Sequence, residues 1–161
     1  MGLGMIKPEK LLEPTSPHVA GDGDIGEIRT IVGFHIRLAH GATYRHFNET
    51  FTDLDLTQKQ VSVLWLIDDH PDISQTDLAQ RMRMDRATTM AIVNRLQARA
   101  YLARGKSPSD GRKQTLNLTE KGRQALIAAK DATATHERWL KSRFNDREVD
   151  TLIELLTRIY A

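Results

Sequence analysis

The sequence of 161 residues contains no cysteine. This absence excludes disulfide bonds, zinc sites built from cysteine and thiol-based redox sensing. Long apolar runs are absent as well, so the sequence offers neither a membrane-spanning helix nor the apolar segment of a signal peptide. We therefore expect a soluble, cytoplasmic protein that has no membrane partner.

Catalytic and cofactor motifs are also missing. The sequence contains no GxSxG, no HExxH and no paired-carboxylate pattern. Residues 105–107 read GKS, like the end of a phosphate-binding P-loop, but Ala100 stands where that motif requires glycine. No two of the six histidines are four residues apart, as two metal ligands on one helix face would be. We expect no enzyme activity, no cofactor and no metal site, and a sensor metal site assembled across several helices stays open as an alternative.

Positive charge is abundant in one segment of the chain. Residues 74–118 contain nine Arg and Lys and three Asp, a net charge of +6, whereas the whole chain carries only +2. The remaining residues therefore sum to −4. Such a concentration of positive charge in one small module is typical of a surface that binds nucleic-acid phosphates.

The N-terminal half of the chain divides into an arm and two helices. Residues 1–24 contain several prolines and glycines and little periodicity, which predicts a flexible arm. Apolar residues recur at helical spacing over residues 25–47, which predicts one long amphipathic helix. Thr57 and Gln60 have the spacing of a capping box and predict the start of the next helix, which ends before Pro71.

A helix-turn-helix and a hairpin follow. Ser74 and Asp85 can each cap a helix, and the second of these helices, which we call the recognition helix, is expected to end near Arg99. Strands are expected over residues 101–104 and 112–118, with a tip over residues 105–111. We call this hairpin the wing.

Two more helices complete the chain. Thr119 begins one that runs to about residue 144, and Asn145 with Glu148 begins the last. The last helix has a broad apolar stripe that contains Leu152, Leu156 and neighbouring residues. Broad apolar stripes at both ends of the chain favour a homodimer built from the two termini, and a monomeric helical cap is the alternative.

The expected fold is therefore mainly α with a small β-wing: a winged helix-turn-helix plus terminal dimerisation helices. We assign residues 1–24 to the arm, 25–48 and 119–161 to a helical dimerisation region, and 55–118 to a DNA-binding domain.

Three segments of the chain resemble the MarR family of bacterial transcriptional regulators. They read LTQKQVSVLWLI, ISQTDLAQRMRMDRATTMAIVNRLQARAYLAR and PSDGRKQTLNLTEKG, of which the last is the most specific. The resemblance extends from about residue 25 to the C-terminus. It implies a winged-helix homodimer that represses genes from a near-palindromic operator of double-stranded DNA. It also implies a small effector, often an aromatic or phenolic acid or its thioester, that releases the DNA.

The sequence departs from the usual family pattern at three places. Met90 and Ala91 stand where the family often has a small polar residue followed by Arg. Asn94 replaces a common Asp, and Ala100 replaces the usual Gly at the end of the recognition helix. The turn after that helix therefore either adopts another conformation or carries about 1 kcal/mol of strain.

Candidates for DNA contact lie on the recognition helix, at the start of the preceding helix and around the wing tip. They are Gln75, Thr76, Arg86, Thr88, Thr89, Met90, Arg95, Lys106, Asp110, Arg112 and Lys113. Arg112 is the side chain expected to reach a minor groove or a phosphate, with Asp110 holding either its side chain or its backbone. For Thr88 the alternative is support of the cap, for Thr89 core packing, and for Arg95 and Arg99 ion pairs within the fold.

Aromatic and cationic residues of the first two helices are candidates for an effector pocket. They are His35, Arg37, His40, Tyr44 and Trp65. The family resemblance implies a pocket between the winged module and the dimerisation helices, whereas helical spacing is equally consistent with core packing. The sequence therefore favours a ligand-responsive DNA-binding repressor, and the alternative is a constitutive or architectural DNA-binding protein without an effector.

Overall fold

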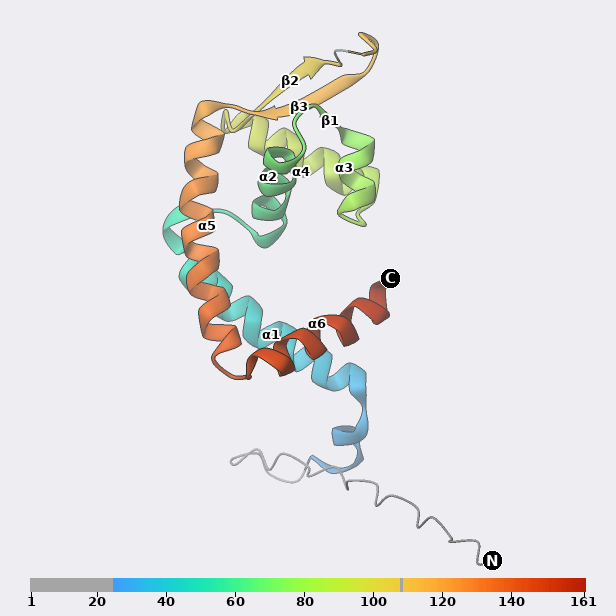
Figure 1. Ribbon diagram of the computed structural model, residues 1–161, viewed down its shortest axis with the longest axis vertical. Coiled ribbons are helices and arrows are strands. Elements are labelled where there is room, and N and C mark those ends of the chain that lie inside the picture. The colour runs from blue at the N-terminus through green and yellow to red at the C-terminus, as the bar shows by residue number, and fades with distance from the viewer. Residues whose placement is uncertain (1–24, 108) are drawn as a thin grey trace, which may run out of the picture. The chain divides into compact units, whose positions relative to one another are not determined.

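The structure, a computed structural model, describes residues 25–107 and 109–161 (Figure 1). With η marking a 3₁₀ helix, the elements are η1 Gly26–Thr30, α1 Val32–Thr50, η2 Thr52–Leu54, α2 Gln58–Asp69, β1 Ile73–Ser74, α3 Gln75–Arg81, α4 Arg86–Ala98, β2 Leu102–Lys106, β3 Gln114–Leu118, α5 Glu120–Lys141 and α6 Asp146–Tyr160. The predicted arm over residues 1–24 lies outside the described residues. Among the helices of the described residues, none combines the length and hydropathy that a membrane span requires.

The chain divides into two compact units, residues 1–37 and 38–161. In the described part of the first unit, the prediction of one continuous helix from residue 25 is wrong. The Thr30 hydroxyl donates to the Glu27 carbonyl, and the Ile31 N–H bonds to the Ile28 carbonyl at 3.0 Å, which is 3₁₀ spacing. Ile31 is then extended (ψ 109°), and α1 begins at Val32. The apolar residues keep their helical spacing on both sides of this break. Such spacing therefore cannot show whether the helix between them is continuous.

Within the second unit, capping side chains define the helix starts as the sequence predicted. Thr57 and Asn145 form capping boxes that begin α2 and α6. Ser74, Asp85 and Thr119 each accept a backbone N–H in the first turn of α3, α4 and α5. Each cap satisfies an N–H group that has no partner within the helix.

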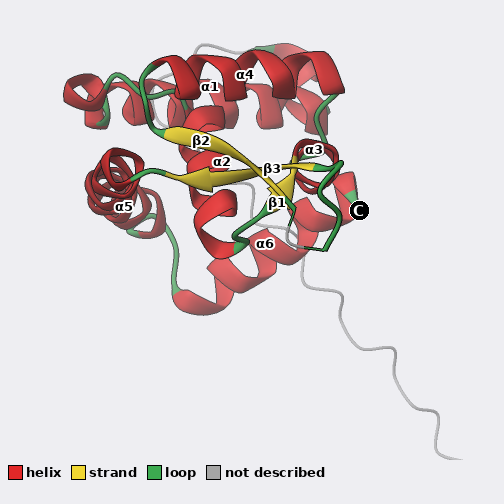
Figure 2. Ribbon diagram, turned by 90° about the horizontal axis from the view of Figure 1, so that it is seen from above, coloured by secondary structure: helices red, strands yellow, loops and turns green. Residues whose placement is uncertain are grey.

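The wing belongs to a three-stranded antiparallel sheet with strand order β1-β3-β2 (Figure 2). The sequence did not predict β1, which pairs Ile73 with Leu116. Strand β2 continues to Lys106, which pairs with Gln114, so the predicted strand ends at residues 104 and 112 are wrong. The ladder of hydrogen bonds extends the first strand to Lys106 and ends on its partner at Gln114, so it does not follow the apolar alternation that marked the strands. The wing tip is therefore residues 107–113.

The turn between α4 and β2 settles the alternatives at Ala100. Ala100 has φ +59°, in the left-handed region that favours glycine. Its N–H bonds to the Gln97 carbonyl at 2.8 Å, and the Tyr101 N–H bonds to the Leu96 carbonyl at 2.9 Å. These two bonds form the Schellman motif that ends many helices. The chain therefore forms the left-handed turn without a glycine and carries the strain.

The core joins the helix-turn-helix to the sheet and to α5. Leu64, Leu96, Leu116 and Leu126 of α2, α4, β3 and α5 are fully buried there. The start of α5 lies very close to the wing, because a Cβ atom added at Gly122 would stand 2.0 Å from the Tyr101 carbonyl oxygen. This packing holds the wing and α5 together at one point.

Candidate nucleic-acid interface and adjacent cavity

The first turn of α4 is organised around Asp85. Its carboxylate accepts the Thr88 N–H at 2.8 Å and the Thr88 hydroxyl at 2.6 Å. These hydrogen bonds, that of the hydroxyl first, lower the pKa of Asp85 below its ordinary value. Thr88 therefore supports the cap, as its alternative interpretation stated. Arg86 and Met90 are exposed on the same helix, and Met90 is 49% exposed.

Thr89 does not lie on this exposed face. Its side chain is 0% exposed, and its hydroxyl donates to the Asp85 carbonyl at 2.9 Å. The expectation that Thr89 contacts DNA is therefore corrected, because a buried hydroxyl bonded within its own helix cannot reach a base. Ala87, Ala91 and Asn94 are exposed instead. The helical spacing from buried Ile92 and Leu96 would have identified this face.

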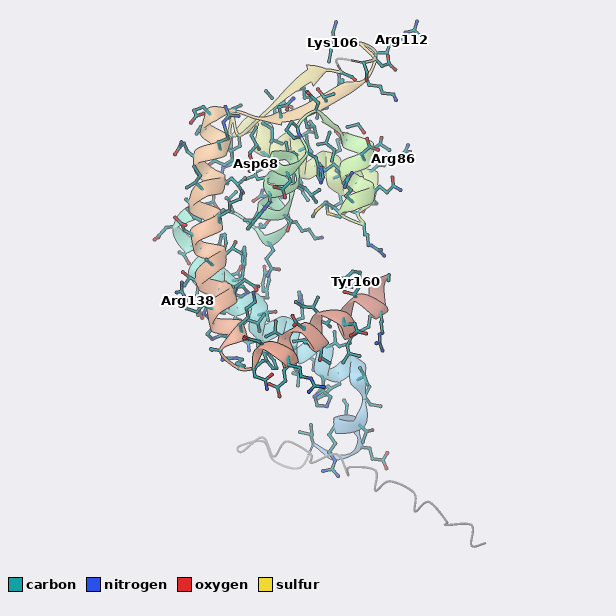
Figure 3. The ribbon with its side chains drawn as sticks, viewed as in Figure 1. Asp68, Arg86, Lys106, Arg112, Arg138 and Tyr160 are labelled. Carbon is teal, nitrogen blue, oxygen red and sulfur yellow. The ribbon has the colours of Figure 1, made fainter. Side chains whose placement is uncertain are left out.

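The wing tip presents cations on a folded backbone. Lys106 at the end of β2 and Arg112 in the tip point outward, and Arg86 lies at the start of α4 (Figure 3). The Asp110 carboxylate accepts the backbone N–H of Arg112 at 3.1 Å, and the Asp110 carbonyl accepts the N–H of Lys113 at 2.9 Å. Asp110 thus holds the backbone around Arg112. A hollow of about 350 Å³ at the tip is lined by Arg104, Gly105, Lys106, Gly111, Arg112, Lys113 and Gln114.

The remaining candidates divide between surface and interior. Arg99 binds inside the fold: its guanidinium donates to the Asp55 carbonyl at 2.5 Å and stacks 4.7 Å from the Tyr101 ring centre. Arg95 is exposed. Gln75 is half-buried and Thr76 exposed at the start of α3. Asp77 in that first turn adds a negative charge, which weakens the case for a phosphate there.

A cavity of about 520 Å³ lies between the end of α1, α2 and α5. We call it the effector cavity after the effector pocket that the sequence led us to expect, and its lining residues are Phe47, Gln58, Val61, Ser62, Trp65, Leu66, Asp69, Thr133, His136 and Glu137. Trp65 is the one predicted pocket residue among them. The Lys130 ammonium lies 5.0 Å from the Trp65 ring centre and 3.0 Å from the Asp68 carboxylate.

The other predicted pocket residues have different contacts. His40 and Tyr44 face each other along α1 with ring centres 6.1 Å apart, and neither lines the effector cavity. In the unit of residues 1–37, His35 Nε2 donates to the Arg29 carbonyl at 2.6 Å. Arg37 in the same unit lies 5.3 Å from the Phe34 ring centre.

Two histidines missed by the sequence interpretation meet at the edge of the effector cavity. His46 Nδ1 and His136 Nδ1 are 2.8 Å apart, so one ring N–H donates a hydrogen bond to the other ring nitrogen. His46 also stacks on Trp139 with ring centres 3.9 Å apart. Burial, followed by the charge of His46, lowers the pKa of His136 below its ordinary value, and Glu137 opposes this shift. Ninety residues separate the two histidines, so no local sequence pattern predicts their contact.

These two histidines do not form a metal site with further ligands. Within residues 25–107 and 109–161, no group of three or more histidine, aspartate and glutamate side chains could hold a metal ion. The alternative of a metal site assembled across helices is therefore not found in this part of the chain.

Comparison with known proteins agrees with this geometry. Residues 54–113 match the sequence model of the MarR family. A Thauera aromatica protein named as a regulator of the hcr operon is 34% identical over 136 residues, which cover 84% of this chain and 82% of that protein. The chain belongs to the MarR family. The predicted family and winged-helix fold class are thereby confirmed.

Solved structures of MarR-family proteins have the same fold. The repressor CouR bound to a 23-mer DNA duplex superposes with a TM-score of 0.81 and 32% identity, covering 88% of this chain and all of that chain. CouR bound to p-coumaroyl-CoA gives a TM-score of 0.76 and 30% identity, covering 86% and 97%. This MarR-family protein is therefore a DNA-binding transcriptional regulator and not an enzyme.

Proposed function

We propose that this MarR-family protein is a repressor that binds a near-palindromic operator as a homodimer. A small aromatic or phenolic anion, or its thioester, binds in the effector cavity and releases the DNA. The observation that carries the proposal is a 520 Å³ cavity, lined by Trp65, between α1, α2 and α5 of a chain that also has a cationic winged helix. The volume lies within the range of about 300–1,000 Å³ typical of small-molecule sites.

The exposed residues of α4 and the wing support operator binding. Arg86 and Met90 stand on the first turns of α4, where a recognition helix meets base edges in the major groove. Arg can pair with guanine, and an apolar side chain can contact the thymine methyl group. Arg95 and the wing cations Lys106 and Arg112 contact phosphates or the adjacent minor groove. Gln75, Thr76 and Lys113 lie at the margins of this surface.

The apolar surface of α6 supports a homodimer. Helix α6 contains no buried residue, and Ile153, Leu155 and Ile159 are 57%, 49% and 63% exposed. Ile28 and Val32 in the first unit are 46% and 68% exposed. Apolar helix faces of this extent are normally covered by a partner. We assign residues 25–48 and 119–161 to the dimer interface.

The chemistry of the effector cavity supports an aromatic or phenolic effector. Trp65 and Phe47 offer aromatic surface, while Asp69 and Glu137 can accept a hydrogen bond from a phenolic hydroxyl. Lys130 lies above the Trp65 ring, where its ammonium is paired with the Asp68 carboxylate. CouR, a relative of this fold, binds a phenolic thioester, p-coumaroyl-CoA. An effector releases DNA only to the extent that it binds better to an arrangement that does not fit the operator.

A titration tests the effector. The protein first selects a duplex from genomic fragments. Its affinity for that duplex is then measured at increasing concentrations of hydroxybenzoic acids, hydroxycinnamic acids and their thioesters. A typical coupling of about 1–3 kcal/mol lowers operator affinity by about 5- to 150-fold. Trp65→Ala should abolish this response. Tyr44→Ala, an aromatic deletion on α1 outside the cavity, should preserve the response once analytical ultracentrifugation has shown that this variant is still a dimer. If no compound changes affinity, the protein is a constitutive DNA-binding protein without an effector.

A further inference from the structure

Arg104 connects the wing to the recognition helix. From strand β2, its Nη2 donates to Asn94 Oδ1 at 2.8 Å and its Nε to Gln97 Oε1 at 2.9 Å, both on α4. Its Nη1 donates to Gln114 Oε1 of β3 at 3.2 Å. One planar guanidinium thus holds three side chains from two elements, α4 and β3. No local sequence pattern indicates this role, because the partners lie seven to ten residues away.

The partners of Arg104 leave its charge intact. All three are neutral amide oxygens, and none of the ion pairs within the described residues includes Arg104. Asn94 is decisive here, because it stands where the MarR resemblance leads one to expect Asp. An Asp in that position would accept the same hydrogen bond and cancel the charge. Asn94 keeps the geometry and leaves a full positive charge between α4 and the wing.

We propose that Arg104 is the positioning residue of the DNA-binding surface. It fixes the wing relative to the recognition helix, so that both reach the DNA in one arrangement. Its uncancelled charge adds to the attraction for the phosphate backbone. The inference rests on the proposed operator binding. It predicts that a wing–DNA contact contributes less to binding affinity when the connection between the wing and α4 is removed.

A double-mutant cycle tests the positioning role. The probe is a duplex that the wild-type protein selects from a random library, and a random-sequence duplex of equal length is the control. Arg104→Lys keeps the charge but loses the planar fork. We expect Arg112→Ala to weaken binding to the selected duplex at least about threefold less in the Arg104→Lys background than in the wild type. Unfolding midpoints of the variants without DNA show that each remains folded.

Two substitutions at Asn94 test the charge. Asn94→Asp keeps the acceptor and cancels the charge of Arg104, so the slope of log K against log salt should fall by about one unit. Asn94→Ala removes one of the three acceptors without adding charge, so its slope should fall less than that of Asn94→Asp. Equal slopes for Asp and Ala would overturn the charge assignment.

The outcomes separate this inference from the proposed function. If the wild-type protein selects no duplex, operator binding itself fails. If it selects a duplex but the effects of Arg104→Lys and Arg112→Ala add, only the positioning role is overturned. A reduced slope for Asn94→Asp together with a non-additive cycle is the expected result.

Discussion

Replacing Ala100 by glycine should stabilise this protein. Ala100 has φ +59° at the end of α4, and a residue with a Cβ atom pays about 1–2 kcal/mol in this region. Glycine removes that cost, but it gives the unfolded chain more freedom, which offsets about 0.4–1 kcal/mol. The difference is a gain of about 1 kcal/mol in the free energy of unfolding. For a chain of 161 residues this raises Tm by about 2–4 °C.

Thermal unfolding followed by circular dichroism measures this effect. All variants are compared at one protein concentration, since Tm of an associating protein depends on concentration. Ala91→Gly is the matched control, because it makes the same change in the exposed middle of α4. There glycine should lower the free energy of unfolding by about 1 kcal/mol. If both variants lower Tm equally, Ala100 is not in a strained left-handed conformation and the reasoning is refuted.

Three further predictions concern other parts of the fold. Gly122→Ala should sharply lower the yield of folded protein or its Tm, since its Cβ would meet the Tyr101 carbonyl oxygen; normal unfolding would show that α5 can shift away from the wing. The pKa of His136 lies below its ordinary value of 6.5, so its contribution to stability is complete above that pH and declines as the pH falls further. Tm measured from pH 8 to pH 5 should therefore decrease toward pH 5, and the decrease should be smaller in His136→Gln. Truncation before Asn145 removes α6 and should yield monomers in analytical ultracentrifugation, whereas a soluble truncated dimer would place the interface elsewhere.

The helix starts were predictable because caps are local. Thr57, Ser74, Asp85, Thr119 and Asn145 each act on a backbone N–H within three residues, so their identity and spacing suffice. Strand β1 was not predictable, because its two residues are defined by pairing with a strand more than 40 residues later. Long-range pairing leaves no periodic trace in so short a segment.

The same distinction applies to the site. Arg112 and Lys106 were placed at the wing because hairpin and charge patterns are local. Thr89 was misplaced because a threonine on a helix can either face solvent or bury its hydroxyl against the carbonyl four residues earlier. Arg104 and His136 escaped notice because their roles depend on partners brought together by the fold.

In the wing tip, the groups that form the turn differ from the side chains that carry its positive charge. Asp110 holds the turn through the backbone N–H groups of Arg112 and Lys113, so neither cationic side chain takes part in forming it. Under the proposed operator binding, substitutions at those two positions therefore alter which DNA is preferred at little cost in folding. During divergence from a common ancestor, such a tip can acquire new operator preferences one side chain at a time while the scaffold beneath it stays constant. The Asp110 carboxylate, in contrast, accepts a backbone N–H of the tip, so its loss would remove one of the hydrogen bonds that shape the turn.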